Sequence, residues 1–100
     1  LTYNLSGLEI PLDSWYIDHF RKGTSPDVQL DGKQIAEVKH LLLSSTTTLK
    51  ADYDAGKFQN FKTYQTSYGV ELTSIEEAIA FNTTHEGMHL GYMMSIRKFV

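Results

Sequence analysis

The sequence contains no cysteine among its 100 residues. This absence excludes disulfide bonds, thiolate nucleophiles and cysteine-ligated metals within the chain. It is compatible with a reducing compartment, and we expect a cytoplasmic protein. Proline is also scarce, with 2 residues, and glycine contributes only 7. A disordered or fibrous protein has a different composition, so the chain is expected to fold.

Long apolar runs and basic clusters are missing as well. No run approaches the roughly 20 apolar residues that a membrane-spanning helix needs, so we expect no membrane segment. The formal net charge is -3 and the longest basic run is Arg97-Lys98. This balance argues against nucleic acid as a partner. The chain also lacks a P-loop, a G-x-G-x-x-G sequence and a G-x-S-x-G nucleophile motif.

The length predicts a single domain over residues 1–100. Hydrophobic residues make up 41% of the chain, which permits a modest core. Because the first residue is Leu1 rather than methionine, we expect a C-terminal fragment of a longer chain.

Helix signals dominate the first half of the sequence. Gly7 is placed to end a short helical segment that contains Leu1 and Leu5. A second short helix is expected after Asp13, to about residue 22. A long helix is expected from residue 31 to about residue 55, because Asp31 and Gln34 form a capping-box variant and Gly56 is a natural stop. Its apolar stripe is predicted to run through Ile35, Val38, Leu42, Ser45, Leu49 and Tyr53.

The second half predicts a short extended or hairpin-like segment near residues 57–72, followed by another helix. Aromatic residues alternate with polar ones in the first part, which disfavours a helix. Thr73 and Glu76 match a capping box, so we expect a helix from Ser74 to about Lys98. Its wide apolar arc is typical of a central helix in a bundle. The fold class is therefore mainly α, a helical bundle with a small extended segment.

The chemically informative residues are His85 and His89, within the sequence HEGMH. They lie one helical turn apart, on the stripe expected to face the core. Two histidines at i and i+4 can bind one divalent metal, and neutral imidazole suits Zn, Ni, Cu or Fe. The alternative is a pair of core histidines that are hydrogen-bonded to other protein groups. Asn82 adds a polar group to the same arc.

The same string matches the H-E-x-x-H pattern of zinc proteases, in which Glu86 would be the general base. Those enzymes need a third ligand downstream. The extended form of that motif requires glycine and histidine where this chain has Tyr92 and Ser95. We therefore do not expect a zincin protease.

The other two histidines are weaker ligand candidates. His19 lies on the short aromatic helix that also carries Trp15, Tyr16 and Phe20. His40 falls off the apolar stripe of the long helix, so a solvated side chain is expected.

Residues 80–93 (AFNTTHEGMHLGYM) resemble the last helix of the DinB/YfiT-like family, which reads H-E-x-x-H-x-G-x-I. Residues 69–78 resemble the extended segment that leads into this helix in the family. The resemblance is specific over residues 69–98. It implies a DinB-like four-helix bundle that is partial here, without the first helix and most of the second.

The resemblance also implies a divalent metal held by three histidines, most often Zn or Ni. Two of those positions correspond to His85 and His89, and the third lies in a part of the family pattern that precedes Leu1. Glu86 would act as a base or as an orienting group beside the ligands. Family members act on small-molecule substrates, some with a low-molecular-weight thiol, and often form homodimers.

Two functions follow as hypotheses. The first is a metal-dependent enzyme of the thiol S-transferase or hydrolase type. The second is a non-catalytic DinB-like binding or stress-associated module with an incomplete or structural metal site.

Overall fold

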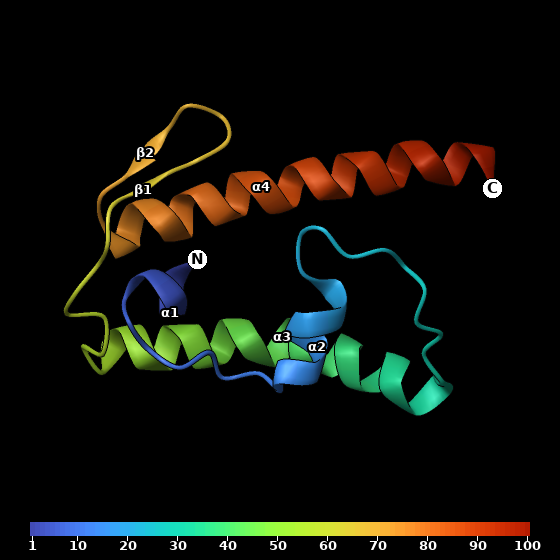
Figure 1. The fold of residues 1–100 in the computed structure, drawn as a ribbon, viewed down its shortest axis with the longest axis horizontal. Helices are drawn as coiled ribbons and strands as arrows, with labels where there is room; N and C mark the ends of the chain where they lie inside the picture. The colour runs from blue at the N-terminus through green and yellow to red at the C-terminus, as the bar shows by residue number, and fades with distance from the viewer. The chain divides into compact units, whose positions relative to one another are not determined.

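The computed structural model describes all residues from 1 to 100 and is mainly helical (Figure 1). It contains four α-helices, a two-stranded hairpin and one terminal 3-10 turn. In chain order these are α1 (Thr2–Leu5), α2 (Ser14–Phe20), α3 (Gly32–Asp54), β1 (Tyr64–Gln65), β2 (Glu71–Leu72), α4 (Ile75–Ile96) and η1 (Arg97–Phe99). The predicted fold class, including the hairpin within residues 57–72, is confirmed.

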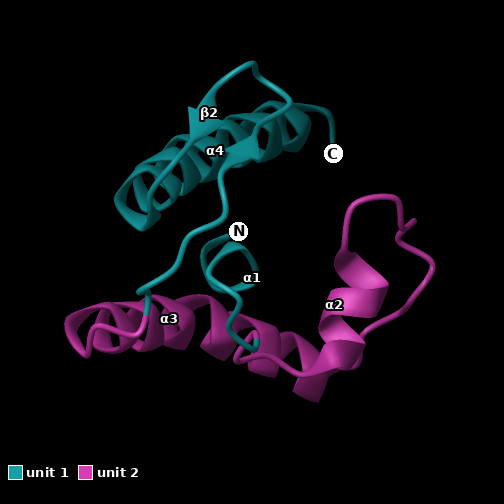
Figure 2. Ribbon diagram, turned by 60° about the vertical axis from the view of Figure 1, so that its left-hand side comes forward, with its two compact units in different colours: residues 1–9, 58–100 teal, residues 10–57 magenta.

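The chain divides into two compact units (Figure 2). Unit 1 contains residues 1–9 and 58–100, and therefore α1, the hairpin and α4. Unit 2 contains residues 10–57, and therefore α2 and α3. The candidate histidine pair belongs to unit 1.

In unit 2, local capping signals set where α3 begins and ends. The Asp31 carboxylate accepts a hydrogen bond from the backbone N–H of Gln34 at 2.8 Å, and the Asp31 N–H donates to Oε1 of Gln34 at 3.0 Å. Gly56 takes a positive φ of 68°, which ends the helix as expected. The predicted capping box and both ends of this helix are confirmed. The predicted apolar stripe is not buried, since α3 contains no buried residue.

The shorter helix α2 begins at its predicted cap. Asp13 accepts from the backbone N–H of Trp15 at 2.8 Å. The helix ends at Phe20, two residues before the expected end. Tyr16 of α2 hydrogen-bonds Glu37 of α3, and this bond is the main reason that the pKa of Tyr16 rises to about 12. A phenol that stays protonated throughout the neutral range can keep this link between α2 and α3.

In unit 1, a short antiparallel hairpin precedes α4. Tyr64 pairs with Leu72, and Gln65 pairs with Glu71. In the connecting turn, the Thr66 N–H donates to the Val70 carbonyl at 2.9 Å and the Val70 N–H donates to the Thr66 hydroxyl at 3.1 Å. Gly69 has a φ of 78°, a conformation that side chains disfavour. The turn therefore depends on glycine at that position.

The small core of unit 1 lies where the hairpin meets the start of α4. Its buried apolar residues are Leu72, Ile75 and Ala78. Helix α1 also contacts α4, and the Lys62 N–H donates to the Leu5 carbonyl at 2.7 Å. These contacts hold the first turns of α4 in place. The later turns of α4 are not held by them.

The cap of α4 corrects the sequence prediction by one residue. Ser74, not Thr73, is the N-cap, and its hydroxyl accepts from the Glu77 N–H at 3.2 Å. Glu77, rather than Glu76, reaches back and accepts from the N–H and the hydroxyl of Thr73 at 2.6 and 2.9 Å. Both frames contain a hydroxyl residue followed three positions later by glutamate, so the motif alone could not separate them.

The hydrogen bonds of the Glu77 carboxylate predict that the stability of the fold depends measurably on pH. The hydrogen bonds from Thr73 lower the pKa of Glu77 below its ordinary value of 4.5. A carboxyl with a depressed folded-state pKa stabilises the fold above its unfolded pKa, and loses that effect as the pH falls through the folded pKa. Glu77→Gln is therefore expected to lower the melting temperature at pH 7 by a few degrees, with a difference that shrinks below pH 4. Thermal unfolding followed by circular dichroism from pH 7 to pH 3 measures this.

The control for this variant is Glu9→Gln, which changes an exposed carboxyl outside the cap. It should follow the wild-type curve. A Glu77→Gln difference that stays constant down to pH 3 would contradict the proposed role of the carboxylate.

Helix α4 ends at Ile96, and the 3-10 turn η1 continues to Phe99. The predicted helical run to about Lys98 is therefore close, but its last turn is tighter. Every residue from 89 to 100 is exposed. Gly87 and Gly91 face open space, with no neighbouring atom near an added Cβ. None of the helices, including this apolar one, is long and apolar enough to cross a membrane.

Candidate metal centre

The two candidate ligands are brought together on α4. Nε2 of His85 and Nε2 of His89 lie 3.0 Å apart, and their rings meet edge to face with centroids 4.6 Å apart. The helical spacing of four residues places the side chains on the same face, as predicted. The two imidazoles therefore turn the same nitrogen toward a common point.

A separation of 3.0 Å fits two chemical states. Two nitrogens bound to one metal at about 2.0–2.1 Å lie roughly 2.9–3.4 Å apart when the angle between them is octahedral or tetrahedral. The same separation suits a hydrogen bond in which one Nε2 carries the proton. In the metal-bound state, each neutral imidazole carries its proton on Nδ1. The residues therefore fit two positions of a metal's coordination shell.

Aromatic rings from two elements enclose His85. Phe81 of α4 stacks on it with centroids 6.0 Å apart and an angle of 21° between the planes. Tyr68, in the hairpin turn, lies edge-on to it at 6.1 Å, and the Tyr68 hydroxyl donates to Sδ of Met88 at 3.1 Å. Nδ1 of His85 is buried and has no hydrogen-bond partner. At its Nδ1 edge the ring is thus held by packing and not by a hydrogen bond.

The expectation that the stripe buries both histidines is only half correct. His85 is half-buried, whereas His89 is exposed. Tyr68 of the hairpin turn contacts His85 and Met88, whereas His89 stays open within unit 1. An exposed imidazole next to a half-buried one is accessible to a small ligand.

Glu86 and Asn82 form a separate pair on the neighbouring part of the helix. The Asn82 amide Nδ2 donates to Oε1 of Glu86 at 2.8 Å, and both residues are exposed. This bond orients the carboxylate of Glu86, the residue that directly follows His85 in the chain. The proposed role of Glu86 as a base or orienting group stays a prediction.

The other histidines have their own surroundings in unit 2. Nδ1 of His19 lies 2.7 Å from the Trp15 carbonyl, and the ring stacks on Trp15 at 4.4 Å. His40 is exposed on α3, as predicted. No group of three or more His, Asp or Glu side chains in the chain is arranged to hold a metal ion. The pair on α4 is thus a two-ligand arrangement.

The sequence of the chain also matches a known protein family. The family model of the DinB superfamily matches residues 1–93. The chain belongs to the DinB superfamily. The mainly helical architecture with a small hairpin ahead of the last long helix is thereby the DinB fold. No curated protein and no solved structure matches the chain.

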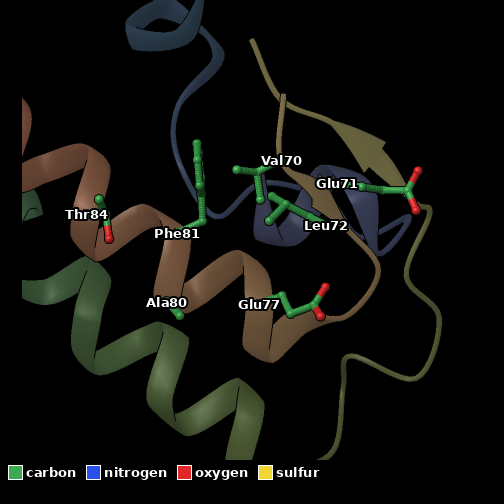
Figure 3. A pocket seen from close by; sticks show the side chains of 7 residues that line it. All are labelled: Val70, Glu71, Leu72, Glu77, Ala80, Phe81 and Thr84. Atoms are coloured by element: carbon green, nitrogen blue, oxygen red, sulfur yellow. The ribbon is translucent and has the colours of Figure 1, made fainter. Parts of the chain in front are cut away.

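A shallow hollow of this DinB fold is lined by residues of the hairpin and of α4 (Figure 3). It measures about 340 Å³. Val70 and Leu72 project from the hairpin toward Phe81 of α4, whereas the Glu71 carboxylate points away. The remaining lining residues are Glu77, Ala80 and Thr84. Phe81 thus serves both features, since it lines the hollow and stacks on His85.

Tyr68 and Phe81 are the surrounding residues that the sequence did not single out. The position of Phe81, four residues before His85, is a signal that could have identified it. Tyr68 carries no such signal, because its approach to His85 depends on how the hairpin folds over α4.

Proposed function

We propose that His85 and His89 bind a divalent metal, Zn²⁺ or Ni²⁺, and that the chain uses it in a metal-dependent transfer or hydrolysis reaction on a small molecule. The observation that carries this proposal is the 3.0 Å approach of the two Nε2 atoms. Membership of the DinB superfamily supports the same interpretation.

When bound at an open site, a divalent metal lowers the pKa of a water or thiol and so supplies a nucleophile near neutral pH. The residues of the chain contribute access and orientation. His89 is exposed and leaves room for a small substrate, including a low-molecular-weight thiol. Phe81 and Tyr68 keep the His85 ring in place. Glu86, held by Asn82, is the nearest carboxylate in sequence that could accept a proton.

A second function is favoured by a different observation. The pair consists of two imidazoles, and no group of three or more His, Asp or Glu side chains is arranged to hold a metal ion. Two ligands leave a metal less firmly held than the three or four of typical protein sites. A non-catalytic binding module, in which the pair is structural or part of an incomplete site, is therefore the alternative.

Metal content of the purified chain tests the proposal. The chain should be prepared without a histidine tag, incubated with Zn²⁺ or Ni²⁺, desalted and measured by elemental mass spectrometry. We expect bound metal in a fixed ratio to protein. Assays of thiol transfer and of ester and amide hydrolysis then separate the two functions. Bound metal without any turnover would favour the binding module, and the absence of bound metal would refute the proposal.

A further inference from the structure

We propose that Met88 is a site of reversible oxidation, at which a peroxide converts the thioether to the sulfoxide and thereby releases the tip of the hairpin from α4. The tip of the hairpin is the turn of residues 66–70 that connects β1 with β2. The observation that carries this inference is the contact between the Tyr68 hydroxyl and the Met88 sulfur, which lies wholly within unit 1. The inference requires neither a bound metal nor a second chain.

The Tyr68 side chain ties the tip of the hairpin to one face of α4. Its hydroxyl donates a hydrogen bond to Sδ of Met88 at 3.1 Å, between residues that are 20 positions apart in the chain. The centroid of its ring lies 5.9 Å from that of Phe81 and 6.1 Å from that of His85. Phe81, His85 and Met88 follow one another at intervals of four and three residues, so they share a face of the helix. One side chain of the turn therefore contacts three residues of α4.

The rest of the tip is weakly anchored. Residues 67–70 are all exposed, whereas Leu72 at the base of the hairpin is 2% exposed. Val70, which projects toward Phe81, is itself 49% exposed (Figure 3). A segment with few buried contacts opens at a low cost in free energy. Loss of the Tyr68 contact is therefore expected to open the tip while the base of the hairpin stays closed.

Oxidation of Met88 changes the atom that accepts the hydrogen bond. A peroxide transfers one oxygen atom to the thioether, so that a sulfur–oxygen bond forms and the oxygen–oxygen bond breaks. The sulfur loses two electrons, and the peroxide is reduced to water or an alcohol. The product is a polar, chiral sulfoxide in place of a flexible apolar side chain.

Neither epimer of the sulfoxide keeps the contact as it stands. When the new oxygen faces the Tyr68 hydroxyl, a hydrogen bond between the two oxygens needs about 2.7–2.8 Å. The 3.1 Å between hydroxyl and sulfur then leaves no room for the oxygen unless Tyr68 moves. When the oxygen takes the other position on sulfur, it withdraws electron density, and the weak thioether acceptor is lost. In both epimers, Tyr68 is expected to leave Met88 and its ring contact with His85.

The other two methionines provide an internal comparison. The chain contains three methionines, and Met93 and Met94 are 60% and 62% exposed, whereas Met88 is half-buried. Because susceptibility to oxidation follows exposure, we expect a peroxide to oxidise Met93 and Met94 first. Both follow Met88 by more than one helical turn, so their oxidation should leave the hairpin unchanged. Only the slower step at Met88 is expected to change the structure.

The test uses a variant in which Met88 is the only methionine. The full chain with Met93→Leu and Met94→Leu is treated with hydrogen peroxide in the presence of EDTA. Peptide mass spectrometry then measures the fraction of Met88 that has become the sulfoxide. We expect Met88 to be oxidised completely, and more slowly than Met93 and Met94 are in the unsubstituted chain.

Amide hydrogen exchange followed by nuclear magnetic resonance measures the consequence. The reporters are the N–H of Thr66, which donates to the Val70 carbonyl at 2.9 Å, and the N–H of Val70, which donates to the Thr66 hydroxyl at 3.1 Å. Oxidation should accelerate their exchange about 10-fold, as expected for the loss of one intramolecular hydrogen bond. The amides of residues 75–80 should keep their rates. Treatment with both methionine sulfoxide reductases, one for each epimer, should restore slow exchange.

Two variants serve as controls. Met88→Leu keeps the size and the apolar character of the side chain but cannot be oxidised. Its tip should exchange at the same rate before and after peroxide treatment, although Met93 and Met94 become oxidised. Tyr68→Phe keeps the ring and removes the hydroxyl, so its tip should exchange faster from the start and respond less to oxidation of Met88.

Three results would overturn the proposal. Unchanged exchange of the tip after complete oxidation of Met88 would show that the contact does not hold the hairpin. Equal acceleration in the tip and in residues 75–80 would show that oxidation destabilises unit 1 as a whole. A Met88 side chain that stays reduced in the variant without Met93 and Met94 would show that peroxide does not reach it. These results leave the proposed metal binding untouched, because every measurement is made in EDTA.

Discussion

Replacing either His85 or His89 with alanine is expected to lower the affinity for Zn²⁺ at least 100-fold. The two Nε2 atoms converge at 3.0 Å, so each substitution removes one donor from the same coordination shell. Loss of a residue that only supports a ligand already costs about 10- to 100-fold in metal affinity, and loss of the ligand itself costs more. Competition with a chromophoric chelator measures the change.

His40→Ala is the matched control, because it removes an exposed histidine from α3, outside the candidate centre. Its zinc affinity should equal that of the wild type. The circular dichroism spectra of all three variants should remain those of a helical protein, since His89 is exposed and His85 is only half-buried. Equal zinc affinity in the wild type and both α4 variants would show that the 3.0 Å contact is a hydrogen bond between imidazoles.

The elements whose ends are set by local chemistry could be predicted from the sequence. Asp31, Gln34 and Gly56 define α3 through hydrogen bonds and a positive φ that involve only near neighbours. The predicted N-cap of α4 was wrong by one residue, because Thr73 and Ser74 both satisfy the capping-box pattern. In the structure the hydrogen bond from the Glu77 N–H to the Ser74 hydroxyl distinguishes them.

Burial was the property that the sequence could not predict. The period of an apolar stripe tells which residues share a face of a helix, but not what covers that face. The stripe of α3 and the later turns of α4 are exposed, although their sequences read as core. At the candidate site, helical spacing predicted that His85 and His89 would meet. The approach of Tyr68 depends on the long-range fold of the hairpin and carried no local signal.

A substitution in the core of unit 1 is the second change for which we expect a large effect. Leu72 is 2% exposed and joins Ile75 and Ala78 where the hairpin meets α4. Leu72→Ala is expected to lower the free energy of unfolding by about 2–4 kcal/mol, because it removes buried methyl groups and leaves a cavity. For a chain of this size, that corresponds to a fall in melting temperature of roughly 10 °C or more. Urea and thermal unfolding followed by far-ultraviolet circular dichroism measure both quantities.

The control is Leu43→Ala, which shortens a leucine that is 73% exposed on α3. It should change the free energy of unfolding by less than about 0.5 kcal/mol, since surface substitutions rarely do more. Equal losses in the two variants would contradict the placement of the core. Because Leu72 anchors the hairpin that carries Tyr68 to His85, Leu72→Ala should also weaken zinc binding, while Leu43→Ala should not. The stability of this small core and the order of the metal centre are thus expected to fall together.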